Sequence, residues 1–160
     1  MLDLAKHKTL WTIRKYENDE AVRDNRPYEV NEIPYNCLLG EGITLLQNLL
    51  IGAGGTPFNN ANAYIGVGDS NTAAVQGQTG LQAGSNKAYQ PMATSYPTVT
   101  NQTTDWRASF DGSTANFHWQ EFTVANGNSD SAVNLNRAVS DQGTKTAGQT
   151  WTVDVQITWS

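Results

Sequence analysis

Few side chains in this sequence combine the residue types and the spacing that a catalytic site requires. The chain has two histidines, His7 and His118, and a hydroxyl or thiol nucleophile needs such a base within hydrogen-bonding reach. His118 stands between Phe117 and Trp119, so on a strand its ring would point away from the face of its aromatic neighbours. We therefore interpret His118 as a solvent-facing residue of a sheet and not as a catalytic base.

Metal-binding patterns are equally scarce. The single cysteine, Cys37, excludes both an intramolecular disulfide and a cysteine zinc cluster, and its leucine neighbours favour a buried thiol. Asn126, Asn128 and Asp130 alternate as calcium-loop ligands do, but no glutamate completes such a loop. Side chains of this type also satisfy their own backbone in turns. We expect no metal, no cofactor and no catalytic residues.

One acidic residue, Glu121, is embedded among apolar neighbours, Trp119 and Phe122. A carboxylate in such a place can act as a general acid or can form an ion pair. Cleavage of a glycosidic bond needs a second carboxylate facing the first, and the other acidic candidates fall in turns or on polar strand positions. We therefore expect Glu121 to pair with Arg107 or Arg137 across strands.

The clearest structural signal is the segment 151–159, in which every odd position is apolar and every even position is polar. Side chains alternate between the two faces of a strand, so this pattern predicts a strand with one buried face. Trp151 and Trp159 lie on that face together with three β-branched residues. The rest of the chain must supply the surface that this strand covers.

One helix and several more strands precede it. Apolar residues at the helical period predict a helix near 43–51, and the glycines at 52–55 end that helix instead of cradling a phosphate at the start of one. A one-residue change of apolar parity after Trp119 predicts a β-bulge. The remaining segments are a strand at 63–70, a surface loop at 71–85, an edge strand within 87–97, and a hairpin of 106–110 with 115–119.

Together these segments predict one mainly β domain, an antiparallel β-sandwich or jelly-roll-like fold with one short α-helix. Only 16% of the residues are charged, the net charge is -5 and the pI is about 4.8. Such a surface argues against nucleic acid or an anionic membrane as a partner. No signal peptide and no spanning segment are visible, so we expect a soluble product made in the cytoplasm.

Charge is concentrated in residues 1–32, which hold 13 of the 25 charged side chains, six basic and seven acidic. We interpret this range as an extended N-terminal arm and residues 33–160 as the β domain. A purely disordered tail would lack aromatic and β-branched residues. We therefore expect the arm to order on a neighbouring subunit or other partner surface, through Trp11, Ile13, Arg14, Lys15 and Tyr16.

Three runs together resemble a known group of proteins. They are Ala63-Tyr64-Ile65-Gly66-Val67-Gly68-Asp69-Ser70, Asn116-Phe117-His118-Trp119-Gln120-Glu121-Phe122, and Asn134-Leu135-Asn136-Arg137 leading to Gly143-Thr144-Lys145 and Gly148-Gln149-Thr150-Trp151. They resemble small β-rich virion structural proteins of tailed double-stranded-DNA bacteriophages. The resemblance covers roughly residues 40 to 160 and leaves the expected arm outside.

The resemblance implies a non-enzymatic protein of the virion, and most of all a capsid decoration or cement protein. Such a protein would bind the major capsid protein on the outer head surface as a homotrimer. It would stabilise the shell by mass action, because it binds only the assembled form. Two alternatives stay open. One is a tail-associated baseplate, fibre or neck component, and the other is a carbohydrate-binding host-recognition module using the 71–85 loop, Tyr89 or Tyr96.

Overall fold

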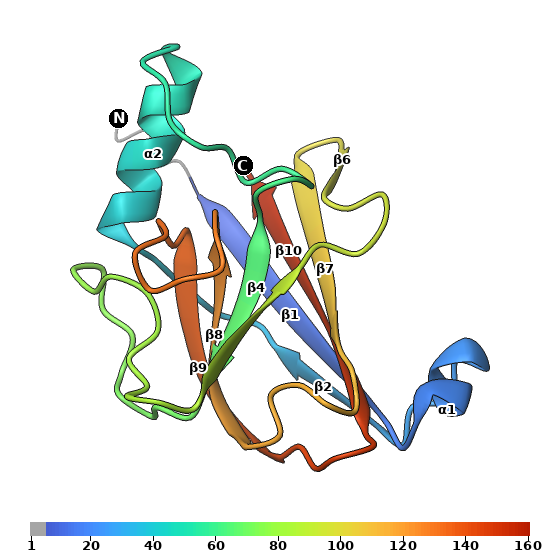
Figure 1. Ribbon diagram of the computed structural model, residues 1–160. Coiled ribbons are helices and arrows are strands. Elements are labelled where there is room, and N and C mark those ends of the chain that lie inside the picture. The colour runs from blue at the N-terminus through green and yellow to red at the C-terminus, as the bar shows by residue number, and fades with distance from the viewer. Residues whose placement is uncertain (1–5) are drawn as a thin grey trace.

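The computed structural model describes residues 6–160, which form two antiparallel sheets of five strands each and little helix (Figure 1). The first sheet has the order β2 (Glu29–Ile33), β1 (His7–Tyr16), β10 (Thr150–Trp159), β7 (Thr103–Phe110) and β6 (Thr98–Thr100). The second has the order β3 (Cys37–Leu38), β9 (Asn136–Thr144), β8 (His118–Ala125), β4 (Tyr64–Gly68) and β5 (Lys87–Pro91). The helices are α1 (Asp19–Arg23) and α2 (Gly40–Leu50).

The predicted strand at 151–159 is confirmed as β10, which lies at the centre of the first sheet. It pairs with β1 on one side and with β7 on the other. Trp151, Val153, Val155 and Ile157 are all buried, so the apolar face of the pattern is the core face. The opposite, polar face is less exposed to solvent than the sequence predicts, because Asp154 on that face is also buried.

The prediction of an extended N-terminal arm is wrong for residues 6–32. Strand β1 lies inside the first sheet and pairs with β10 from His7 opposite Trp159 to Tyr16 opposite Thr150. Helix α1 and strand β2 follow within the same range, and β2 pairs with β1. The charged residues that suggested an arm lie mainly on the outward positions of β1 and around α1. Because so many charged residues surround it, the alternation of apolar residues in β1 is short and hard to recognise in the sequence. Residues 1–5 of that prediction lie outside the described residues.

The two sheets share one core. Trp119 on β8 packs edge-on against Phe110 on β7 and Trp151 on β10, with ring centroids 4.8 Å apart in both pairs. Trp11 on β1 contacts Phe122 on β8 with centroids 5.9 Å apart. These contacts cross from one sheet to the other, so aromatic packing holds the sheets face to face.

The predicted hairpin of 106–110 with 115–119 is wrong: a strand covers 106–110, but the next strand, β8, begins only at His118 and does not pair with it. Strand β7 pairs with β10 and β6, whereas β8 pairs with β4 and β9. The turn between them passes from one sheet to the other and wraps around Lys145, whose Nζ donates to the carbonyl oxygens of Asp111 and Thr114. Alternation predicts a strand but does not identify its partner. The predicted bulge is confirmed as a register shift between Trp119 and Glu121.

Helix α2 confirms the helix prediction, with a start three residues earlier than 43. It begins without a side-chain cap and ends before Gly52, whose φ of +73° suits glycine. Only part of its apolar surface is covered. Leu45 is buried, whereas Leu50 is 86% exposed and Ile51 just after the helix is 76% exposed. Among the described residues, no helix is long and apolar enough to cross a membrane.

Candidate functional site

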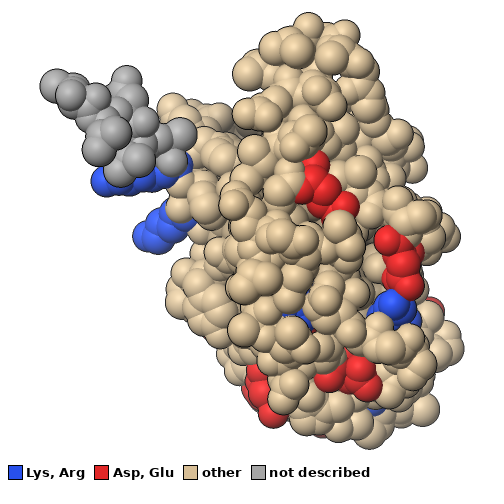
Figure 2. Space-filling model, turned by 90° about the vertical axis from the view of Figure 1, so that its left-hand side faces the viewer, with Lys and Arg blue, Asp and Glu red and all other residues tan. Residues whose placement is uncertain are grey.

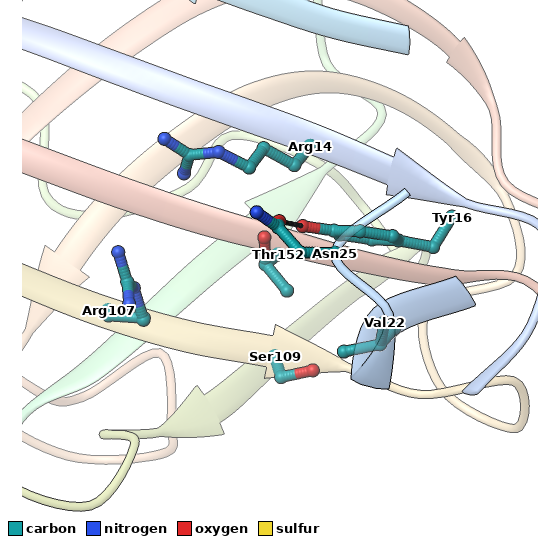
Figure 3. A pocket seen from close by; sticks show the side chains of 7 residues that line it. All are labelled: Arg14, Tyr16, Val22, Asn25, Arg107, Ser109 and Thr152. Atoms are coloured by element: carbon teal, nitrogen blue, oxygen red, sulfur yellow. Dashed lines mark hydrogen bonds between the residues drawn. The ribbon is translucent and has the colours of Figure 1, made fainter. Parts of the chain in front are cut away.

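An open groove of about 540 Å³ lies on the outer face of the first sheet, at the end where α1 projects (Figures 1 and 3). Seven residues from β1, α1, the following turn, β7 and β10 line it: Arg14, Tyr16, Val22, Asn25, Arg107, Ser109 and Thr152. Two of these side chains are positively charged and none is negatively charged. We call this feature the arginine groove.

Strand register brings the groove residues together. Arg14 on β1 stands opposite Thr152 on β10, and Thr152 stands opposite Ser109 on β7. Arg107 lies two residues from Ser109 and therefore on the same face. These positions alternate with the buried core positions of the same strands, so the outward face alone forms the floor of the groove.

Helix α1 closes one end of the groove. The side chain of Asn18 caps this short helix by accepting a hydrogen bond of 2.9 Å from the backbone N–H of Ala21. The chain then turns back through Asn25, which has a φ of +48°, a region that asparagine tolerates. The hydroxyl of Tyr16 donates to Oδ1 of Asn25 at 3.3 Å, a bond visible in Figure 3. This contact ties the end of β1 to the turn after α1.

A buried carboxylate positions both arginines. Asp154 accepts a hydrogen bond from Nη1 of Arg14 through Oδ2 and one from Nε of Arg107 through Oδ1. The side chain of Asp154 is 7% exposed, while those of Arg14 and Arg107 are 33% and 39% exposed. Arg107 also lies over the ring of Tyr96, 4.6 Å from its centroid. Both guanidinium groups are therefore held by Asp154, Arg14 through Nη1 and Arg107 through Nε, and both remain partly exposed where they line the groove.

The groove has the chemistry of an anion-binding site. Asp154 occupies one nitrogen of each guanidinium group, and the hydrogen bonds within residues 6–160 leave the other nitrogens of both groups free. The two arginines and Asp154 together carry a net charge of about +1 at neutral pH. Asp105 lies beyond Arg107 on β7 and does not line the groove. Its pKa is raised, chiefly by burial.

Another polar cluster lies at the surface of the second sheet. Nε2 of His118 contacts Oδ1 of Asp141 at 2.7 Å, and Nδ1 contacts the hydroxyl of Thr144 at 3.3 Å. The side chains of His118 and Asp141 are 40% and 67% exposed. The interpretation of His118 as a solvent-facing sheet residue agrees with this geometry. Within residues 6–160, no three metal-ligating acidic, histidine or cysteine side chains form a group.

The five residues predicted to contact a partner divide between the core and the groove. Trp11 and Ile13 are fully buried. Lys15 is also buried, with Nζ 4.6 Å from the Trp151 ring centroid and donating to the Gln142 carbonyl. The prediction that Trp11, Ile13 and Lys15 bind a partner is therefore wrong, because the chain itself covers them.

Arg14 and Tyr16 do lie in the groove. Sequence reasoning missed their partners there, Arg107 and Asp154, because these residues are far apart in sequence. The available signal was weak. It consists of one arginine in the expected arm, one arginine on an expected strand, and an aspartate on the polar face of another expected strand.

The predicted pairing of Glu121 is confirmed, and its partner is Arg137. Nε of Arg137 donates to Oε2 of Glu121 at 2.7 Å, and both side chains are fully buried. Glu121 also accepts hydrogen bonds from the backbone N–H groups of Gln82 and Ala83, while Arg137 donates to the carbonyl of Thr72. The predicted surface loop at 71–85 is thus fastened onto the second sheet.

A second surface feature surrounds α2. An apolar groove of about 280 Å³ is lined by His7, Leu38, Ile43, Leu46, Gln47, Leu50 and Trp159. From residue 42 to residue 86 the only charged side chain is that of Asp69. Figure 2 shows the side of the molecule that carries α2, and the top of this face, apart from the part drawn in grey and the basic side chains beside it, shows uncharged residues. We call the residues that line this apolar groove, together with the exposed Ile51 just after the helix, the α2 surface.

Comparisons of the chain with protein-family models, with curated proteins and with solved structures gave no match. The arginine groove and the α2 surface are therefore the features of the molecule that bear on its function.

Proposed function

We propose that this chain is a non-enzymatic structural protein of a tailed-bacteriophage virion. In this proposal it decorates the outer surface of the head and stabilises the shell. The observation that carries the proposal is the α2 surface, where Leu50 and Ile51 are 86% and 76% exposed beside an apolar groove. Contiguous apolar surface of this kind marks contacts between proteins.

The charge distribution supports a protein partner at the α2 surface. The net charge of the chain is -5, yet the stretch 42–86 contains a single charged residue. A neutral apolar surface gains little from electrostatic attraction, so its binding energy comes from burial on a close-fitting partner. The proposed partner is the major capsid protein, with the decoration protein present as a homotrimer.

The phage-like sequence runs have structural roles in the chain, which supports a protein without catalysis. Gly68 packs against Glu121, since an added Cβ at Gly68 would lie 2.4 Å from Oε1 of that residue. Glu121 and Arg137 belong to two of these runs and form the buried ion pair. In the finer description that we propose, the two facing sheets are a β-sandwich with jelly-roll-like character, the architecture implied by the resemblance.

Copy number tests the proposal most directly. The amount of this chain should be measured against the major capsid protein in purified particles of the phage that encodes it. Hundreds of copies, in a simple ratio to the capsid protein, are expected for a decoration protein. A few dozen copies or fewer would instead support the tail-associated alternative, and the absence of the chain from particles would overturn the virion proposal.

A paired substitution tests the surface. We expect Leu50→Asp with Ile51→Asp to abolish binding to assembled heads, because burying two carboxylates in an apolar contact is costly. Val99→Asp is the matched control, because Val99 is 72% exposed on β6, away from α2. Equal loss of binding in both variants would contradict the role of the α2 surface.

A second candidate function, a glycan-binding recognition module, is favoured by one observation. The arginine groove presents two oriented guanidinium groups beside hydroxyl and amide side chains. This location differs from the 71–85 loop and Tyr89 of the sequence-based hypothesis, although Tyr96 contacts Arg107.

A further inference from the structure

We propose that the arginine groove binds a saccharide that carries a carboxylate group. This inference concerns a different face of the molecule from the α2 surface and holds wherever the protein resides. It rests on the positions of Arg14 and Arg107, on the buried carboxylate of Asp154, and on the hydroxyl and amide groups around them.

The anionic part of the ligand is inferred from the two guanidinium groups. Each group keeps free N–H donors within the described residues, and the planar fork of arginine matches the two oxygens of a carboxylate. Asp154 fixes both arginines before any ligand arrives, so little side-chain entropy remains to be lost on binding. Arg107 is fixed further by its contact with the Tyr96 ring.

The local charge favours a ligand with one negative charge. Asp154 neutralises one of the two arginines, and Asp105, which interacts with both of them, offsets part of the remaining charge, so the group lacks the strong positive potential that polyphosphates require. The net charge of the whole chain, -5, adds repulsion against nucleic acid. A single carboxylate is the anion that this balance of charge suits best.

The saccharide part is inferred from the rest of the groove. Ser109, Thr152 and Asn25 present hydroxyl and amide groups, which both donate and accept hydrogen bonds as sugar hydroxyls do. Val22 adds a small apolar wall beside Tyr16. The volume of about 540 Å³ lies within the range of small-ligand sites and is far larger than a lone carboxylate needs. A ligand of sugar size would therefore use both the charge and the space.

Four probes separate the components of this ligand: glucuronate, glucose, acetate and inorganic phosphate. Each is titrated into the isolated full-length chain, and binding is followed by calorimetry and by NMR shifts of the arginine side chains. We expect glucuronate to bind at least about tenfold more tightly than glucose or acetate, which corresponds to about 1.4 kcal/mol. Equal affinity for acetate, equal affinity for glucose, preference for phosphate, or no binding of glucuronate at millimolar concentration would each overturn the proposal.

Three variants locate the binding. Arg107→Gln should weaken glucuronate binding at least about tenfold. Arg26→Gln is the matched control, because Arg26 is an exposed arginine paired only with Asp24 at the surface. Ser109→Phe fills the groove from an exposed position and leaves the contacts of Asp154 intact, so it should abolish binding without lowering the Tm. Retained binding in Ser109→Phe, or equal losses in the two arginine variants, would place the ligand elsewhere and overturn the proposal.

Discussion

The side chains of Glu121 and Arg137 form a fully buried ion pair that also holds a long loop. Glu121 receives two backbone N–H groups of that loop, and Arg137 donates to one of its carbonyl oxygens. Each charge is offset by the other and by backbone groups, which helps the fold tolerate buried charges, although Nη2 of Arg137 is buried without a hydrogen-bond partner in residues 6–160. Removal of either partner leaves the other charge buried with only these backbone contacts to compensate it.

We expect Arg137→Met to destabilise the protein by about 3–5 kcal/mol, because it leaves the Glu121 carboxylate buried and unpaired. Urea unfolding measures the effect. Adding Glu121→Gln to this variant should recover part of the loss, since a neutral amide can still accept from the loop N–H groups. Arg26→Met serves as the control, because it breaks an exposed pair worth at most about 1 kcal/mol. Similar losses at positions 26 and 137 would contradict this account.

Asp105 gives a pH-dependent prediction. Its pKa is raised, first by burial, and the negative charge of Asp154 adds to this effect against the opposing hydrogen bond from Gln156 and the charges of Arg107 and Arg14. A carboxyl group whose folded pKa exceeds its unfolded pKa stabilises the fold below the unfolded value. That contribution is lost as the pH rises through the folded value. At neutral pH the ionised form therefore opposes folding.

Asp105→Asn should consequently raise the Tm at pH 7, and the gain should vanish below the ordinary aspartate pKa of about 3.9. Thermal unfolding at pH 7 and at a pH below about 3.9 measures this difference. Asp130 is a control of opposite sign, because a hydrogen bond from Lys87 lowers its pKa. Asp130→Asn should therefore give no gain at pH 7. A gain for Asp105→Asn that is the same at both pH values would contradict the burial of a charge as its cause.

At the scale of elements, the position of α2 depends on Gly42, which has no side chain. A Cβ added at Gly42 would lie 2.5 Å from Cα of Leu135 and 2.7 Å from the carbonyl oxygen of Asn134. Both atoms belong to the backbone just before β9, so neither can move aside as a flexible side chain would. Glycine at this position lets the helix lie directly on the chain that leads into the second sheet.

Gly42→Ala should therefore destabilise the protein by about 1–3 kcal/mol, although alanine is the better helix former by about 1 kcal/mol. Gly40→Ala in the same helix is the matched control. Its added Cβ would lie at an ordinary contact distance of 3.5 Å from the Gln76 carbonyl. Urea unfolding should show no loss for Gly40→Ala, and a stabilising effect of both substitutions would show that the helix is free to shift.

Sequence patterns predicted the presence of strands and of the helix better than they predicted which strands pair. The alternation in 151–159, the parity change after Trp119 and the apolar period of α2 are local, and each corresponds to an observed feature. The arm and the hairpin were wrong because both concern which strands pair, and alternation does not carry this information. The Glu121–Arg137 pair was predictable from burial, whereas the arginine groove depends on a register between three distant strands.

At the scale of the whole molecule, the first sheet joins the two ends of the described chain. Strands β1 and β7 do not pair with each other, and β10 lies between them from Trp151 to Thr158. The backbone N–H of Lys6 donates to the Ser160 carbonyl at 2.8 Å, and the N–H of Ser160 donates to the Lys6 carbonyl at 2.9 Å. The arginine groove exists only in this arrangement, since its floor takes one residue or more from each of the three strands.

The central place of β10 has a consequence for protein synthesis. The ribosome makes β1 first and β10 last of the strands in this sheet. Strand β2 can pair with one edge of β1 early, but the other edge, which pairs with β10, stays open while the intervening chain is translated. Unpaired strand edges with apolar side chains attract other chains during that interval. The β10-facing edge of β1 therefore stays open to other chains until the last strand, and with it the floor of the arginine groove, is complete.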